Sequence, residues 1–60
     1  MIRYQFEFIG SGPLPPPGYT DRYTPVVPGT VELYRTERFL VEAVDHNVEP
    51  PVAVLRKVRS

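Results

Sequence analysis

The sequence predicts a small all-β domain, built as a strongly bent antiparallel sheet or small barrel of four to five short strands. Two observations carry this prediction. Apolar and polar residues alternate near the N-terminus, which is the period of a half-buried strand. Eight Pro and four Gly punctuate only 60 residues, a density that leaves little room for helices. Residues 1–60 are predicted to form a single domain with a small core.

The first predicted strand covers residues 2–9 and ends at Gly10. Its alternate apolar side chains point to one face: Ile2, Tyr4, Phe6 and Phe8. Polar residues occupy most of the positions between them. Because aromatic side chains bury large areas, Phe6 and, further along the chain, Phe39 are expected in the core.

Residues 10–29 are predicted to form a Pro/Gly-rich connecting loop, because they hold all four Gly and six of the eight Pro. The run 13–17 is typical of a polyproline II rod. It is either a P-x-x-P docking motif or a stiff connector, and the absence of a directly flanking base favours the connector. Within the loop we expect three features: Tyr19 and Tyr23 as anchors on the sheet, Val26-Val27 as a brief edge strand, and Pro28-Gly29 as a turn.

Residues 30–45 are predicted to form a β-hairpin with the three-residue loop 35–37. This loop sets Leu33 opposite Phe39 and gives one apolar face, made of Val31, Leu33, Phe39, Val41 and Ala43. A helix over residues 37–46 is the competing interpretation, with Thr36 as its cap. Enrichment in Phe and Val favours the strand.

A loop with Asn47 and two Pro follows, and residues 52–58 are predicted to form the last strand. Its apolar start suggests burial on both faces, and its basic end suggests exposure to solvent. Short strands separated by Pro/Gly turns and a long first loop resemble an SH3-like barrel in pattern.

No catalytic, cofactor-binding or metal-binding residues are predicted, and the protein is not expected to be an enzyme. The chain has no Cys, so it has neither a thiol nucleophile nor disulfides. Gly10-Ser11-Gly12 precedes Pro rather than a helix start, which excludes a phosphate loop. His46 with Asp45 and Glu49 is a poor metal-binding set.

Seven basic and seven acidic residues cancel, so no global field attracts nucleic acid or an anionic membrane. The N-terminus lacks the basic and apolar regions of a signal peptide, and no apolar run is long enough to span a membrane. We therefore expect a cytoplasmic protein without a membrane partner.

The sequence favours a non-enzymatic interaction or assembly module that acts through protein–protein contacts. The apolar residues outnumber what so small a core holds, which predicts a homo-oligomer, most simply a dimer, or another protein partner. The candidate interface residues are Tyr34, Leu40, Val44 and Val52. One alternative is a nucleic-acid-binding barrel that uses a C-terminal basic strip with an aromatic residue: Arg56, Lys57, Arg59 and Tyr34. A second alternative is a subunit of an oligomeric enzyme whose site forms between chains.

Overall fold

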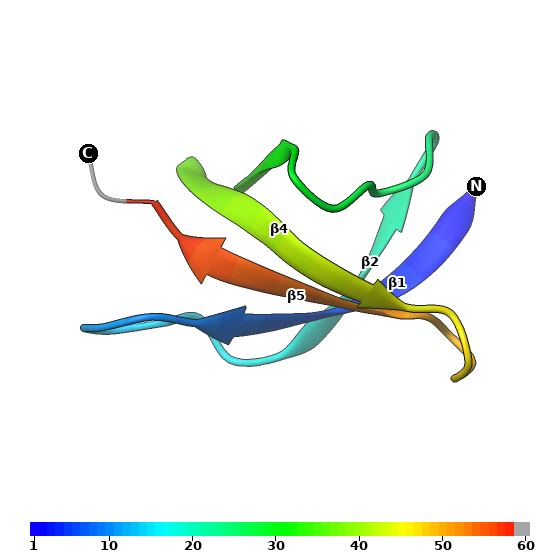
Figure 1. Ribbon diagram of the computed structural model, residues 1–60, viewed down its shortest axis with the longest axis horizontal. Helices are drawn as coiled ribbons and strands as arrows, with labels where there is room; N and C mark the ends of the chain where they lie inside the picture. Colours follow the sequence, from blue (N-terminus) through cyan, green and yellow to red (C-terminus); the bar gives the residue numbers. More distant parts are fainter. Residues whose placement is uncertain (59–60) are drawn as a thin grey trace.

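The computed structural model describes residues 1–58 and contains five strands within them. These are β1 (Ile2–Ile9), β2 (Gly18–Arg22), β3 (Val31–Tyr34), β4 (Glu37–Asp45) and β5 (Val52–Lys57). They form one sheet in the order β2-β1-β5-β4-β3, which curls into a half-barrel (Figure 1). The predicted all-β fold with a strongly bent sheet is therefore confirmed.

The sheet is mixed, which corrects the prediction that all strands are antiparallel. β1 and β5 run parallel, with Phe6 beside Ala53, while the other three strand pairs are antiparallel. A parallel pair needs a long crossover connection, and the chain from β2 through β4 supplies it. β5 consequently lies between β1 and β4, where both Ala53 and Leu55 are fully buried.

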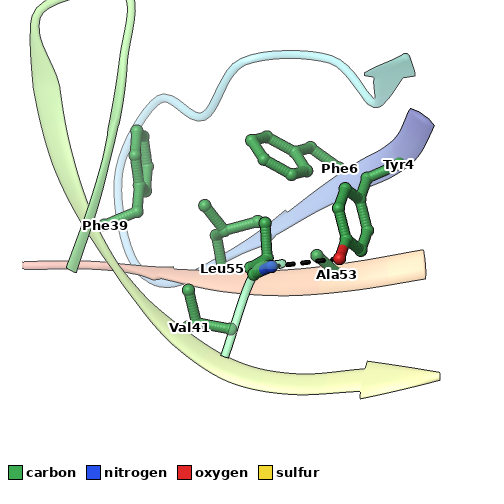
Figure 2. Close-up of a cluster of buried hydrophobic side chains, with 7 residues drawn as sticks. Tyr4, Phe6, Phe39, Val41, Ala53 and Leu55 are labelled. Atoms are coloured by element: carbon green, nitrogen blue, oxygen red, sulfur yellow. Dashed lines mark hydrogen bonds between the residues drawn. The ribbon is translucent and has the colours of Figure 1, made fainter. Parts of the chain in front are cut away.

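The core lies on the concave side of the sheet (Figure 2). Its buried side chains are Tyr4, Phe6, Val26, Phe39, Val41, Ala53 and Leu55. Phe8 is half-buried and lies with its ring 4.9 Å from that of Phe39, which joins β1 to β4 across β5. The two phenylalanines predicted for the core, Phe6 and Phe39, are both completely buried.

Val26 covers one side of this core, so the prediction that Val26-Val27 forms an edge strand is wrong. The Val26 amide donates a hydrogen bond of 3.0 Å to the buried Tyr4 hydroxyl, shown as a dashed line in Figure 2. Proline on either side of the pair, at positions 25 and 28, removes the donors that a strand would need. The Pro28-Gly29 turn is confirmed, because the Thr30 amide donates to the Val27 carbonyl and Gly29 has φ +89°.

The predicted connecting loop 10–29 contains a strand, because residues 18–22 are free of Pro and pair with β1 as β2. β2 is an edge strand, the position that flanking Pro residues tolerate. Its inward positions are Gly18, Thr20 and Arg22, so Tyr19 points outward and is 66% exposed. Tyr23 is 85% exposed, and neither tyrosine is the anchor that the sequence predicted.

The hairpin of β3 and β4 confirms the strand interpretation of residues 37–45 but corrects the register. Its loop is the two-residue turn Arg35-Thr36, with φ of 50° and 66°, and not the predicted three-residue loop. Such turns match the twist of the flanking strands, although they favour Asn and Gly. The one-residue difference reverses both faces of β3, so Val31 and Leu33 point away from the core.

A β-bulge in β4 corrects the last hairpin prediction. The register against β5 shifts between Val41 and Ala43, which leaves Glu42 as an extra residue. Ala43 is exposed rather than in the core, and Val44 packs against the core instead. Because of the bulge, Ala43 points outward and Val44 points inward, which is the reverse of the prediction.

Candidate protein-interaction surface

The convex side of the sheet, which we call the outer face, carries a set of apolar side chains. Residues that are directly opposite each other in adjacent strands share a face, so the register identifies this set. We call it the outer apolar patch; its members are Val31, Leu33, Leu40, Ala43, Val52 and Val54. Val31 is 55% exposed and Leu33 is 64% exposed, while Leu40, Val52 and Val54 are half-buried. A contiguous apolar patch on a protein surface is a candidate site for contact with another protein.

The position of β3 at the edge of the sheet explains why two of these side chains are so exposed. On the outer face Val31 lies opposite Leu40 and Leu33 lies opposite Arg38, so each has a paired neighbour on one side only. On the inner face, Tyr34 anchors β3 to the core, because the centre of its ring lies 5.0 Å from that of Phe8. The core therefore fixes β3 while its outer side chains face solvent.

Opposite charges stand at the two ends of β4 on the outer face. Going along the strand, the outer residues are Arg38, Leu40, Ala43 and Asp45. Within residues 1–58, neither Arg38 nor Asp45 forms an ion pair. One carboxylate oxygen of Asp45 accepts a hydrogen bond of 2.9 Å from the Asn47 amide, which holds this side chain at the strand end.

Two of the neighbouring basic residues of the outer face form ion pairs, whereas Glu7 of β1, which lies beside Val54, accepts a hydrogen bond of 3.3 Å from the Gln5 side-chain amide. Arg56 of β5 pairs with Glu42 of the bulge. Arg3 of β1 pairs with Asp21 of β2 at 3.0 Å, and the hydrogen bond from Arg3 lowers the pKa of the Asp21 carboxyl. Arg38 and Asp45 are therefore the charges on β4 that remain available to a partner within the described part of the chain.

Arg22 closes the gap between the two edge strands, β2 and β3. Its Nε lies 2.9 Å from Glu32 Oε1, and its Nη2 donates to the Leu33 carbonyl at 3.2 Å. Its guanidinium also lies 5.1 Å from the centre of the Phe6 ring. Because Arg22 occupies a carbonyl on the open edge of β3, addition of a further strand there is disfavoured.

The structure divides the four predicted interface residues between the two faces. Leu40 and Val52 lie on the outer face and belong to the outer apolar patch. Tyr34 and Val44 point inward and are half-buried against the core, so they are not part of the same surface. The change in hairpin register moves Tyr34 inward, and the bulge does the same for Val44.

The described residues that were predicted to contact nucleic acid are divided between the two faces of the sheet, with Lys57 and Tyr34 on the inner face and Arg56 on the outer face. Arg56 lies on the outer face beside Glu42, whereas Lys57 points inward, with its Nζ 3.7 Å from Glu37 Oε2. The Tyr34 ring packs on Phe8, and the Arg35 guanidinium lies 5.4 Å from its centre. Arg59 lies outside the described residues.

Sequence reasoning missed Val31 and Leu33 as surface residues. The signal that could have identified them is the pairing of Tyr34 with Glu37 across a two-residue turn at Arg35-Thr36. That turn has neither Gly nor Asn, which are the residues that normally reveal it. The sequence pattern therefore favoured the wrong loop length.

Among residues 1–58, no group of three or more His, Asp or Glu side chains could hold a metal ion. In the same segment no helix is long and apolar enough to cross a membrane. No protein-family model matches the sequence, and no curated protein or solved structure matches the chain.

Proposed function

We propose that the protein is a non-enzymatic assembly module that binds another protein chain through the outer apolar patch. The observation that carries the proposal is the exposure of Val31 and Leu33, 55% and 64%, beside Leu40 on the same face. Removing such side chains from water contributes about 25 cal/mol per Å² of apolar area. Contact with a second protein removes from water the apolar side chains that the small core leaves exposed.

The rigidity of the surface supports the proposal. The patch extends over β3, β4 and β5, and the inner faces of these strands pack into one core. Binding therefore requires little ordering of the backbone, which lowers the entropic cost of association. The charges of Arg38 and Asp45 at either end of β4 provide orientation, because charge complementarity selects one docking direction.

Photo-crosslinking tests the proposal directly. A photoreactive phenylalanine analogue replaces Leu33 in the full chain, expressed in its native cell, and a second variant carries it at Tyr23. Tyr23 is the matched control, because it is 85% exposed but lies on the loop after β2, away from the patch. We expect protein adducts from position 33 and much weaker ones from position 23.

Equal adduct formation at both positions, or none at position 33, would show that the patch is not an interaction surface. The mass of the adduct also identifies the partner, either as a second copy or as a different protein. A cytoplasmic location is part of the same proposal, and fractionation of these cells tests it.

A further inference from the structure

We infer that the partner is a second copy of this chain, packed outer face to outer face about a two-fold axis, with the two β4 strands antiparallel. This inference rests on the proposed function and specifies its partner. The order of outer residues along β4 carries it: a cation, two apolar residues and an anion, namely Arg38, Leu40, Ala43 and Asp45.

This order of residues is complementary to that of a second β4 strand that runs in the opposite direction. When one β4 lies antiparallel over the other, Arg38 faces Asp45 of the partner subunit, and Leu40 faces the partner's Ala43. Both pairings have the same midpoint, between Val41 and Glu42, so one two-fold axis satisfies them together. A self-complementary patch of this kind is what a two-fold contact requires.

The charges select the antiparallel orientation. A parallel arrangement of the two strands would set Arg38 against the partner's Arg38, and Asp45 against the partner's Asp45. Like charges at close range are destabilising, whereas the antiparallel arrangement forms two opposite-charge pairs. Because Arg56 is already paired with Glu42 on each copy, its charge has little effect on which of the two orientations is favoured.

The apolar residues between the charges suit close packing of two sheets. Leu40 is large and Ala43 is small, so a leucine of each copy meets an alanine of the other. Alternation of large and small side chains allows two faces to interdigitate. Aligned sheets pack about 10 Å apart with their strands within about 30° of each other. Val54 lies opposite Ala43 in the same sheet and borders this contact on β5.

Edge-to-edge pairing through β3 is the competing dimer, and two observations disfavour it. Arg22 already bonds to the Leu33 carbonyl on that edge. In addition, β3 has only four residues, so an edge-to-edge pair would form only a short backbone ladder. The face of the sheet is therefore the available surface.

Charge reversal with sedimentation velocity tests the inference. The wild-type chain is compared with Arg38→Glu, Asp45→Arg, and an equimolar mixture of these two variants. Each variant alone would form two repulsive pairs, whereas the mixed dimer would form two attractive pairs. The matched controls Arg35→Glu and Glu49→Arg change the net charge equally at exposed loop positions.

We expect the wild type to dimerise, each single variant to have a dissociation constant raised about tenfold or more, and the mixture to recover wild-type affinity. The controls should remain close to wild type. Circular dichroism verifies that each variant is folded, and recovery in the mixture excludes misfolding as the cause.

A wild-type mass near 6.9 kDa at high micromolar concentration would overturn the inference. Dimers that respond to Arg38→Glu no more than to Arg35→Glu would overturn it as well. Either result, combined with crosslinks from position 33 to a different protein, would leave the proposed function standing. If no crosslink forms from position 33, both the two-fold dimer and the proposed function are wrong.

Discussion

Replacement of Arg22 by Ala should open the half-barrel along its β2–β3 seam. Arg22 is the residue of β2 that bonds to both Glu32 and the Leu33 carbonyl of β3. It also donates to the Thr20 hydroxyl at 2.8 Å, which fixes its orientation. The two edge strands are not neighbours in the sheet, so these side-chain bonds replace a missing backbone ladder.

The expected loss of stability follows from the burial of this ion pair. The side chains of Arg22 and Glu32 are only 28% and 22% exposed. A hydrogen bond to a charged group contributes about 1.5–3 kcal/mol, more than an open surface pair, whose median is about 0–1 kcal/mol. We therefore expect Arg22→Ala to cost about 2–3 kcal/mol. A chain of 60 residues has a total stability of about 3–9 kcal/mol, so the loss is a large fraction.

Urea unfolding followed by circular dichroism measures this loss. The matched control is Arg3→Ala. Arg3 also pairs with a carboxylate, that of Asp21 in β2, but the Arg3 side chain is 65% exposed. Its effect should be much smaller than that of Arg22→Ala. If the two variants unfolded at the same midpoint urea concentration, the conclusion that Arg22 holds β2 and β3 together would be wrong.

Three further predictions concern the turn, the core and pH. Thr36→Gly should raise the free energy of unfolding by about 0.5–1 kcal/mol, because Thr36 has φ +66°; thermal melting checks it, with Thr24→Gly as a control that should not stabilise. Tyr4→Phe should cost about 1–3 kcal/mol in urea unfolding, because it leaves the Val26 amide without its buried acceptor; a fully stable variant would contradict this role. Asp21 has a lowered pKa, so its contribution to stability is present above about pH 3.9 and is lost as the pH falls through the folded-state pKa. Carboxyl NMR titration should show this low pKa and its rise in Arg3→Ala, whereas an unchanged value would contradict the assignment of its cause to Arg3.

The elements that depend on local pattern could be predicted from the sequence. Alternation of apolar residues identified β1 and placed Tyr4 and Phe6 in the core. The Pro28-Gly29 pair identified the turn before β3, since Gly supplies the positive φ that the turn requires. β-branched and aromatic residues correctly favoured a strand over a helix for residues 37–45.

The hairpin register could not be predicted, because it depends on a turn with unusual residues. Arg35 and Thr36 both have positive φ, a conformation that such residues adopt only when the surrounding structure imposes it. Packing of Tyr34 against Phe6 and Phe8 contributes to that constraint, and it involves residues far apart in the chain. Local pattern contains no information on this contact.

The candidate surface was predicted only in part for the same reason. Leu40 and Val52, two of the four predicted interface residues, lie on the outer face, and their role in an interface stays a prediction, whereas Val31 and Leu33 follow from the corrected register. The role of Asp45 depends on the bulge at Glu42, which returns this residue to the outer face with Arg38. A strand without the bulge would place Arg38 and Asp45 on opposite faces, so the charge pattern is visible only in the structure.

The central claim, that the outer face is a self-association surface, is tested most directly by amide NMR spectra recorded over a wide range of protein concentration. We expect concentration-dependent shifts at Leu40, Ala43 and Val54, and constant signals at Tyr23 and in the loop 10–17. Spectra that do not change with concentration, or changes confined to that loop, would contradict the claim.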